Sequence, residues 1–318
     1  MYHRVARPDM DIWELAVSPA HFQQQLRVMQ QVGNVIPAAE LIERLQNETL
    51  KKNSIVITFD DGYVDNFIYA SPLLSKYQLP ATFFIVSENA ALAREFWWDE
   101  LASLLLLSKK LPALFSLAIC AEIIEANLTY EQHLTNELQQ KHQQWKASSE
   151  VPPSRRAQLF YELWLHLKPL ASSKQQQLLH QIRAWANLHA VVRPDYLTIT
   201  RSQLQELNAN PLFTIGAHTV THPALAYQQV ALQHHELVTS KQELEQAISQ
   251  KVALLAYPFG SYNAATITTA AEVGFSAAFT TEAGTVTKKT GCHQVGRFQV
   301  NDWDGESFRW RLKRWFSQ

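Results

Sequence analysis

The stretch of this chain that is most informative about its fold is Ser54-Ile55-Val56-Ile57-Thr58-Phe59, which is followed directly by Asp60-Asp61-Gly62. Its almost continuous apolar and β-branched residues predict a strand buried on both faces, as in a parallel sheet. Two adjacent carboxylates at the end of such a strand are costly to bury unless a cation or hydrogen bonds compensate them. Gly62 permits a sharp turn that aims both carboxylates at one cavity. An ordinary Asp-Gly turn is the alternative interpretation.

Further short apolar runs alternate with helical patterns along the chain. These predicted strands cover residues 81–86, 213–217, 252–257, 276–280 and 294–300. The alternation predicts parallel βα units, which close into a barrel or form an open doubly wound sheet. In a barrel, the chemistry lies at the carboxyl ends of the strands. Because Asp60, His218 and Pro258 each follow a predicted strand, we expect them on one face of an α/β fold.

The second notable string is His218-Thr219-Val220-Thr221-His222-Pro223. Its two imidazoles are four residues apart, a spacing that suits one metal ion if the segment makes a helical turn. Pro223 disfavours the helical region for His222, so the turn is expected to be irregular. One Asp and two His form a catalytic metal set with coordination positions left open. With a second Asp as general base, this combination indicates metal-assisted hydrolysis.

The composition of the chain limits the class of protein and the partners that we expect. The chain has 318 residues, of which 47% are hydrophobic and 18% charged, and this is enough apolar mass for a large core. The net charge of -1 gives no electrostatic reason to expect nucleic acid as a partner. We see no secretory signal and no run long enough to span a membrane. Cys120 and Cys292 lack metal-ligand spacing and are interpreted as free thiols in a reducing compartment, so the expected location is cytoplasmic.

Residues 99–194 interrupt the alternation of strands and helices. The stretch is rich in Leu, Gln, Ala and Lys, and we find no convincing strand in it. We predict a mostly helical insertion into a single domain that covers residues 1–318. Whether the insertion only packs against the barrel or also lines the substrate site is left open.

Three strings resemble the first three motifs of the polysaccharide deacetylase family (NodB homology, carbohydrate esterase family 4). They are Thr58 to Tyr63, His218 to Pro223 and Ala256 to Gly260. Tyr2 to Val5 and Phe96 to Glu100 are similar to a branch associated with bacterial surface-polysaccharide synthesis. The resemblance implies a distorted (β/α) barrel of the NodB-homology type and removal of acetyl groups from N-acetylated sugars.

The resemblance also implies roles for individual residues. Asp60 becomes the general base, and Asp61, His218 and His222 become ligands of a divalent metal, expected to be zinc. The backbone N–H of Phe259, after the proline of the third motif, is expected to stabilise the oxyanion.

The chain departs from the family pattern in two places, and in each case another residue has to take the role of the missing one. Ala256 stands where the family has an arginine that orients the catalytic aspartate, and Arg297 is the candidate replacement. The alternative is that Arg297 forms an ordinary ion pair at the core edge. The late Leu-x-His motif that supplies the general acid is not recognisable, so His3 is the preferred substitute and His293 the second choice. A third option is that Asp60 or the metal site returns the proton.

The sequence indicates the substrate and the residues that contact it less clearly. Tyr63 and Trp303 are candidate sugar contacts, with core or rim packing as the alternative. The expected partner is an N-acetylated glycan or a nucleotide- or lipid-linked sugar. The basic segment 309–314 leaves peripheral membrane contact open. Two other functions remain possible on the same fold: a catalytically inactive glycan-binding protein, and a hydrolase of another C–N amide bond, such as an N-formyl sugar or a non-sugar amide.

Overall fold

The computed structural model describes residues 1–92, 94–189 and 191–317, and they group into two compact units. The sheet unit comprises Met1–Arg7, Leu15–Ala93 and Thr198–Gln318. The insertion unit comprises Pro8–Glu14 and Arg94–Leu197. Its longer segment includes the predicted insertion over residues 99–194, and its shorter segment, Pro8–Glu14, lies outside that prediction.

The sheet unit is built on parallel strands. Their bounds are Thr58–Phe59 (β5), Ala81–Ile85 (β6), Phe213–Ala217 (β9), Leu254–Ala256 (β10) and Ala277–Phe279 (β11). They are hydrogen-bonded in the order β11-β10-β9-β6-β5, and every junction is parallel. Two short parallel pairs join Arg4–Val5 (β1) to Ala16–Val17 (β2) and Asn34–Val35 (β3) to Ser54–Ile55 (β4). The result is the predicted distorted (β/α) barrel, with a curled sheet that is left partly open.

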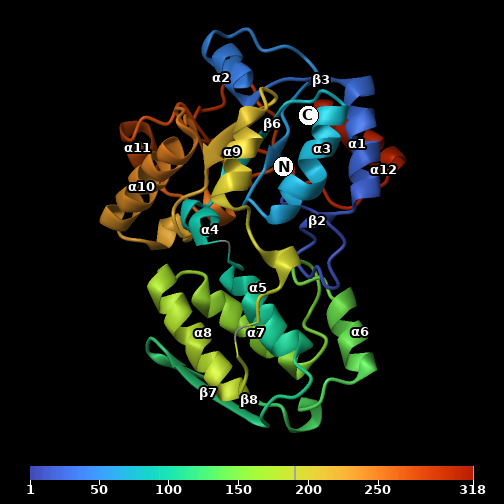
Figure 1. Cartoon of the computed structure of the whole chain (residues 1–318), viewed down its shortest axis with the longest axis vertical. Helices are drawn as coiled ribbons and strands as arrows, with labels where there is room; N and C mark the ends of the chain where they lie inside the picture. The colour runs from blue at the N-terminus through green and yellow to red at the C-terminus, as the bar shows by residue number, and fades with distance from the viewer. Residues whose placement is uncertain (93, 190, 318) are drawn as a thin grey trace. The chain divides into compact units, whose positions relative to one another are not determined.

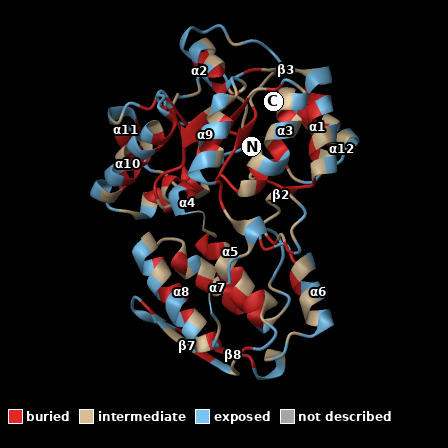
Figure 2. Cartoon of the chain, viewed as in Figure 1, coloured by how far each residue is buried: buried red, intermediate tan, exposed pale blue. Residues whose placement is uncertain are grey.

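Helices cover the sheet and explain why its strands are apolar on both faces. Their bounds are Pro19–Val32 (α1), Ala38–Gln46 (α2), Ser71–Lys76 (α3), Ser87–Leu92 (α4), Arg201–Ala209 (α9), Val230–Ile248 (α10), Ala264–Glu272 (α11) and Gly305–Phe316 (α12). Helices α1 and α12 lie side by side, as do α10 and α11 (Figure 1). The strands between them are buried (Figure 2). Phe59 and Phe83 of adjacent strands stack at 4.9 Å between ring centroids.

The amino-terminal residues extend the sheet at its β5 edge. Tyr2 pairs with Phe59 in parallel: its N–H donates to the Thr58 carbonyl at 2.8 Å, and its carbonyl accepts from the Asp60 N–H at 3.0 Å. Because a parallel pair keeps residues in step, His3 lies beside Asp60 at the carboxyl end of β5. His3 and Asp60 therefore lie at the same edge of the sheet.

The strand predicted over residues 294–300 is wrong for most of its length. Only Val295 pairs with the sheet, through a parallel bridge to Phe279. Beyond it the chain turns toward the amino terminus, where the Phe298 carbonyl accepts from the amino group of Met1 and the Val300 N–H donates to the Met1 carbonyl. These hydrogen bonds replace a continued ladder on β11.

The insertion unit contains both helices and an antiparallel hairpin. Its helices are Trp97–Ala102 (α5), Asn136–Gln144 (α6), Arg155–Leu167 (α7) and Ser172–Ala186 (α8), and its strands are Leu114–Ile119 (β7) and Glu122–Asn127 (β8). The expectation of no strand in this stretch is therefore wrong. Buried Phe115 and Ile119 alternate with exposed neighbours, the period-two pattern of a half-buried strand. Among the described residues, no helix is long and apolar enough to cross a membrane.

Candidate active site

The carboxyl ends of β5 and β9 bring the two sequence motifs together. Strand β6 lies between these two strands in the sheet. The acidic pair Asp60-Asp61 follows β5 directly, and His218 follows β9. All of these side chains are buried, with exposed fractions of 1% for Asp60 and 4% for Asp61.

Asp61, His218 and His222 form a compact group of possible metal ligands. One ligand atom from each lies within 4.8 Å of the others. Oδ1 of Asp61 lies 3.3 Å from Nε2 of His218 and 3.2 Å from Nε2 of His222. The Nδ1 atom of His218 is 2.8 Å from the carbonyl oxygen of Ala256, which can only accept, so Nδ1 carries the proton and Nε2 offers its lone pair. A carboxylate and two imidazoles in this arrangement fit a divalent cation.

Burial and mutual contact act in opposite directions on the charges of this group. Burial alone would raise the pKa of Asp61, but the close contacts of its carboxylate with His218 and His222 hold that pKa well below its usual range. Burial lowers the pKa of His222 despite the opposing charge of Asp61. Both shifts favour an ionised carboxylate beside a neutral imidazole, which are the protonation states that a metal ligand requires.

The backbone of the site is strained. Asp61, Thr219, His222 and Phe259 have φ values of 73°, 65°, 59° and 57°, in the left-handed region that non-glycine residues rarely occupy. The turn between the two histidines is thus irregular, as Pro223 predicts. The Thr219 hydroxyl oxygen accepts the N–H of His222 at 3.0 Å and closes this turn. Strain of this kind is typical of functional sites.

Asp60 is held by Arg297. The Nη1 and Nη2 atoms of Arg297 lie 2.7 and 2.6 Å from Oδ1 and Oδ2 of Asp60. The guanidinium also donates to the Thr58 hydroxyl at 3.1 Å and to the Thr280 carbonyl at 2.9 Å. Burial alone would raise the pKa of Asp60, but Arg297 and His218 hold it below the usual range. An arginine thus reaches the candidate base although Ala256 occupies the position where the family has one.

The two candidate general acids lie in different surroundings. His3 is partly buried, and its pKa is lowered by burial against the opposing charges of Asp61 and Asp60, so its ring lies within electrostatic reach of the site. Nε2 of His293 lies 2.9 Å from the carbonyl oxygen of Phe275. Phe275 precedes β11, so His293 is engaged near the amino end of that strand, whereas the site is at the carboxyl ends. Of the two, His3 is the one next to Asp60 at this edge of the sheet.

The candidate substrate contacts are placed differently from one another. The Phe259 ring lies 4.5 Å from the His222 ring, which puts this segment beside the metal ligands. Tyr63 is fully buried, with its ring 4.6 Å beneath the Arg4 guanidinium, so it has no exposed face for a sugar. Trp303 packs against the core with Arg311 4.1 Å above its ring. The packing alternative accounts for the positions of both Tyr63 and Trp303.

Glu236 of α10 is a buried acid that the sequence reading missed. Its carboxylate accepts three hydrogen bonds from the loop between His218 and His222, and burial raises its pKa. Its neighbour Leu237 is buried in the core. The only signal in the sequence is that this acid adjoins an apolar residue of an amphipathic helix.

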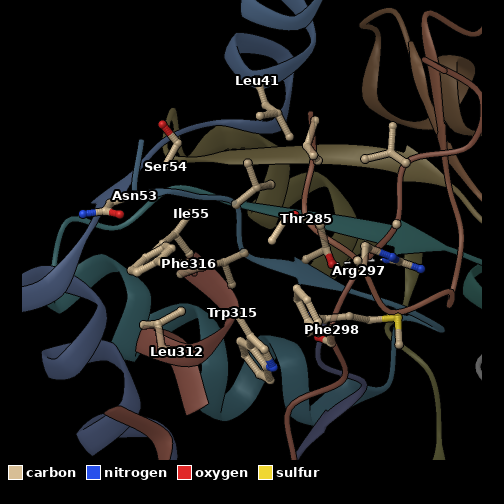
Figure 3. A pocket seen from close by; sticks show the side chains of 18 of the residues that line it. Leu41, Asn53, Ser54, Ile55, Thr285, Arg297, Phe298, Leu312, Trp315 and Phe316 are labelled. Carbon is tan, nitrogen blue, oxygen red and sulfur yellow. Dashed lines mark hydrogen bonds between the residues drawn. The ribbon is translucent and has the colours of Figure 1, made fainter. Parts of the chain in front are cut away.

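A cavity of about 400 Å³ in the sheet unit is distinct from this site. Figure 3 shows its mostly apolar wall, which includes Leu41, Ile55, Phe298, Leu312, Trp315 and Phe316. None of the three metal-ligand candidates lines it, nor does Asp60. Three residues that line it also make polar contacts at Asp60 or beside it: Tyr2, Thr58 and Arg297.

Comparisons with known proteins agree with this geometry. A family model described as polysaccharide deacetylase matches residues 47–106 and 167–278, together more than half of the chain. The "Putative polysaccharide deacetylase YxkH" of Bacillus subtilis is 19% identical over 303 residues, which are 95% of this chain and 70% of that protein.

Solved structures share the fold. The Streptococcus pyogenes deacetylase PplD, determined in complex with acetate, gives a TM-score of 0.55 at 20% identity, covering 98% of this chain and 96% of that one. A de-N-acetylase from Aggregatibacter actinomycetemcomitans gives 0.54 at 17% identity, covering 98% and 97%. At such low identities, these likenesses show the fold alone.

Proposed function

This chain belongs to the polysaccharide deacetylase family, and we propose that it is a metal-dependent hydrolase that removes the acetyl group from an N-acetylated sugar of a surface polysaccharide or its precursor. The observation that carries the proposal is the meeting of Asp61, His218 and His222 beside the separate, arginine-held Asp60. A glycan-binding protein without turnover has no need of the second carboxylate. The description of similar structures as a deacetylase bound to acetate and a de-N-acetylase supports the acetamide as the scissile group.

In the proposed mechanism, Asp61, His218 and His222 hold a divalent cation, with zinc expected. Such an ion supplies a Lewis acid that polarises the amide carbonyl and makes a water molecule more acidic. Asp60 is ionised and accepts the proton of the attacking water, while Arg297 fixes the orientation of its carboxylate.

The remaining steps are assigned to His3 and Phe259. The Phe259 N–H donates to the developing oxyanion. His3, beside Asp60, gives a proton to the departing sugar amine, so that the C–N bond breaks to release acetate and a free amine. The proton that Asp60 takes from the attacking water balances the proton that His3 delivers to the departing amine.

The test is acetate release from a panel of N-acetylhexosamine oligomers and nucleotide- and lipid-linked N-acetylated sugars. Protein stripped with a chelator should release none, and added Zn²⁺ should restore release. Asp61→Asn should lose bound metal, whereas Asp60→Asn should keep metal and lose turnover. Bound metal without release of acetate from any of these substrates would instead favour the glycan-binding alternative.

A further inference from the structure

Glu236 holds the loop that connects the two metal-binding histidines. Its exposed fraction is 3%. Oε2 accepts the backbone N–H groups of Val220 and Thr221 at 2.8 and 2.9 Å, and Oε1 accepts the Thr221 hydroxyl at 2.6 Å. All three donors lie between His218 and His222, so this one carboxylate fixes the middle of the loop.

The same loop is held from its other side by the start of α4. The N–H groups of Ser87 and Glu88 donate to the carbonyls of Thr219 and Val220, each at 3.1 Å. Ser87 in turn donates its hydroxyl to Glu243 at 2.5 Å. Glu243 lies seven residues, or about two helical turns, after Glu236 on α10, so one face of that helix supports both sides of the loop.

This support matters because the loop is strained at both ends. Thr219 and His222 adopt left-handed φ values of 65° and 59°. Such conformations cost energy in residues with a Cβ, particularly in a β-branched threonine, and persist only where surrounding contacts enforce them. Without the three acceptor contacts of Glu236, the loop is free to relax and move His222 away from Asp61.

We propose that Glu236 is a positioning residue whose carboxylate preorganises the His218–His222 loop for metal binding. The inference rests on the proposed metal site. In this proposal, Glu236 contacts neither metal nor substrate. Its positioning role depends on the geometry of its hydrogen bonds rather than on its negative charge.

The test measures Zn²⁺ affinity of the chelator-stripped protein by competition with a chromophoric chelator. Glu236→Leu should weaken binding by about 10- to 100-fold, as expected when a group that orients a metal ligand is removed. Glu236→Gln should bind nearly as well as wild type, because the amide oxygen can accept both N–H groups and the amide nitrogen can donate to the Thr221 hydroxyl.

Glu245→Leu is the matched control. Glu245 lies on the same helix and accepts the backbone N–H of Val252 at 3.0 Å, but it does not contact the histidine loop. Its loss should lower stability and leave Zn²⁺ affinity unchanged. If Glu236→Leu fails to fold, Thr221→Val removes one donor more gently and should weaken Zn²⁺ binding by several-fold.

Two results overturn the proposal. One is wild-type Zn²⁺ affinity in folded Glu236→Leu, or in Thr221→Val where Glu236→Leu does not fold. The other is an affinity of Glu236→Gln as low as that of Glu236→Leu, because then charge and not geometry is what matters. Absence of Zn²⁺ binding by the wild-type protein would contradict the proposed function itself and is thereby distinguished from a failure of the Glu236 inference alone.

Discussion

Arg297 grips Asp60 with both terminal nitrogens, at 2.7 and 2.6 Å, although the two residues are 237 positions apart in the chain. Bidentate pairing of this kind fixes the plane of the carboxylate as well as its charge. The pair is buried, and the Phe84 and Phe279 rings lie 5.5 and 5.8 Å from the guanidinium. Asp60 thus has an arginine partner, which comes from a segment near the other end of the sequence.

Arg297→Lys should therefore reduce deacetylation more than it reduces stability. Lysine keeps the positive charge but cannot engage both oxygens in one plane. We expect kcat/KM for acetate release to fall by about 100-fold, the usual consequence of a slightly misplaced catalytic group. Bound Zn²⁺ should be unchanged, because Arg297 contacts none of the three candidate ligands.

Arg297→Met provides the matched stability test. It leaves the Asp60 carboxylate buried without its ion-pair partner, which should cost about 3–5 kcal/mol in the free energy of unfolding. Adding Asp60→Asn should recover part of that loss, because both charges are then gone. Urea denaturation of the two single variants and the double variant gives the coupling energy. Additive losses would mean that the two side chains do not interact.

His3→Ala should lose turnover and keep metal. If His3 protonates the leaving amine, its removal should lower kcat by on the order of 100- to 10,000-fold. His293→Ala is the control and should turn over like wild type, since His293 bonds to the Phe275 carbonyl. Wild-type acetate release by His3→Ala would show that His3 is not the general acid. Loss of release in His293→Ala would instead indicate His293 as the general acid.

The sequence predicted the core of the site because strand ends obey a simple rule. Apolar runs identified the parallel strands, and the carboxyl ends of parallel strands share one edge of the sheet. Asp60, Asp61, His218 and His222 could therefore be grouped without coordinates. Arg297 could be named only as a candidate, since nothing local at position 297 indicates a partner 237 residues away.

Other features of the structure could not be predicted from the sequence, for physical reasons. Burial of Tyr63 depends on Arg4, which arrives from a different segment to cover its ring. Glu236 looks like an ordinary helical acid until the histidine loop folds over it. The β7–β8 hairpin has no Gly or Pro at its turn, where Cys120 instead takes a φ of 55°. Each depends on tertiary context that local patterns do not carry.

Gly62→Ala should destabilise the site locally. Gly62 has a φ of 75°, and a Cβ there would lie 3.0 Å from Cδ1 of Ile85. Left-handed backbone costs about 1–2 kcal/mol in a residue with a side chain, and the close contact adds to this. Ile85→Val removes the clashing methyl, so Gly62→Ala should cost less in that background. Equal costs in both backgrounds, measured by urea denaturation, would show that the backbone term acts alone.

The insertion unit should lose stability as pH falls below about 6.5, the ordinary pKa of histidine. Burial lowers the pKa of His142, which the Leu106 carbonyl only partly opposes, and the nearby charge of Arg156 lowers it further. Nδ1 of His142 donates to the Leu106 carbonyl at 2.9 Å, and Nε2 accepts from the Ser154 hydroxyl at 2.8 Å. The folded unit therefore needs a neutral ring.

The number of protons bound in the folded and unfolded states determines how the free energy of unfolding changes with pH. Below the unfolded-state pKa of His142, the unfolded chain binds a proton that the folded chain does not, so the free energy of unfolding decreases as pH falls. His166 has a raised pKa and contributes the opposite slope, so the comparison is made in a His166→Gln background. In urea unfolding followed by tryptophan fluorescence, the midpoint urea concentration should fall as pH decreases from about 7 to 5. The same titration of His142→Gln should be flatter, and an equal slope in both proteins would exclude His142 as the source.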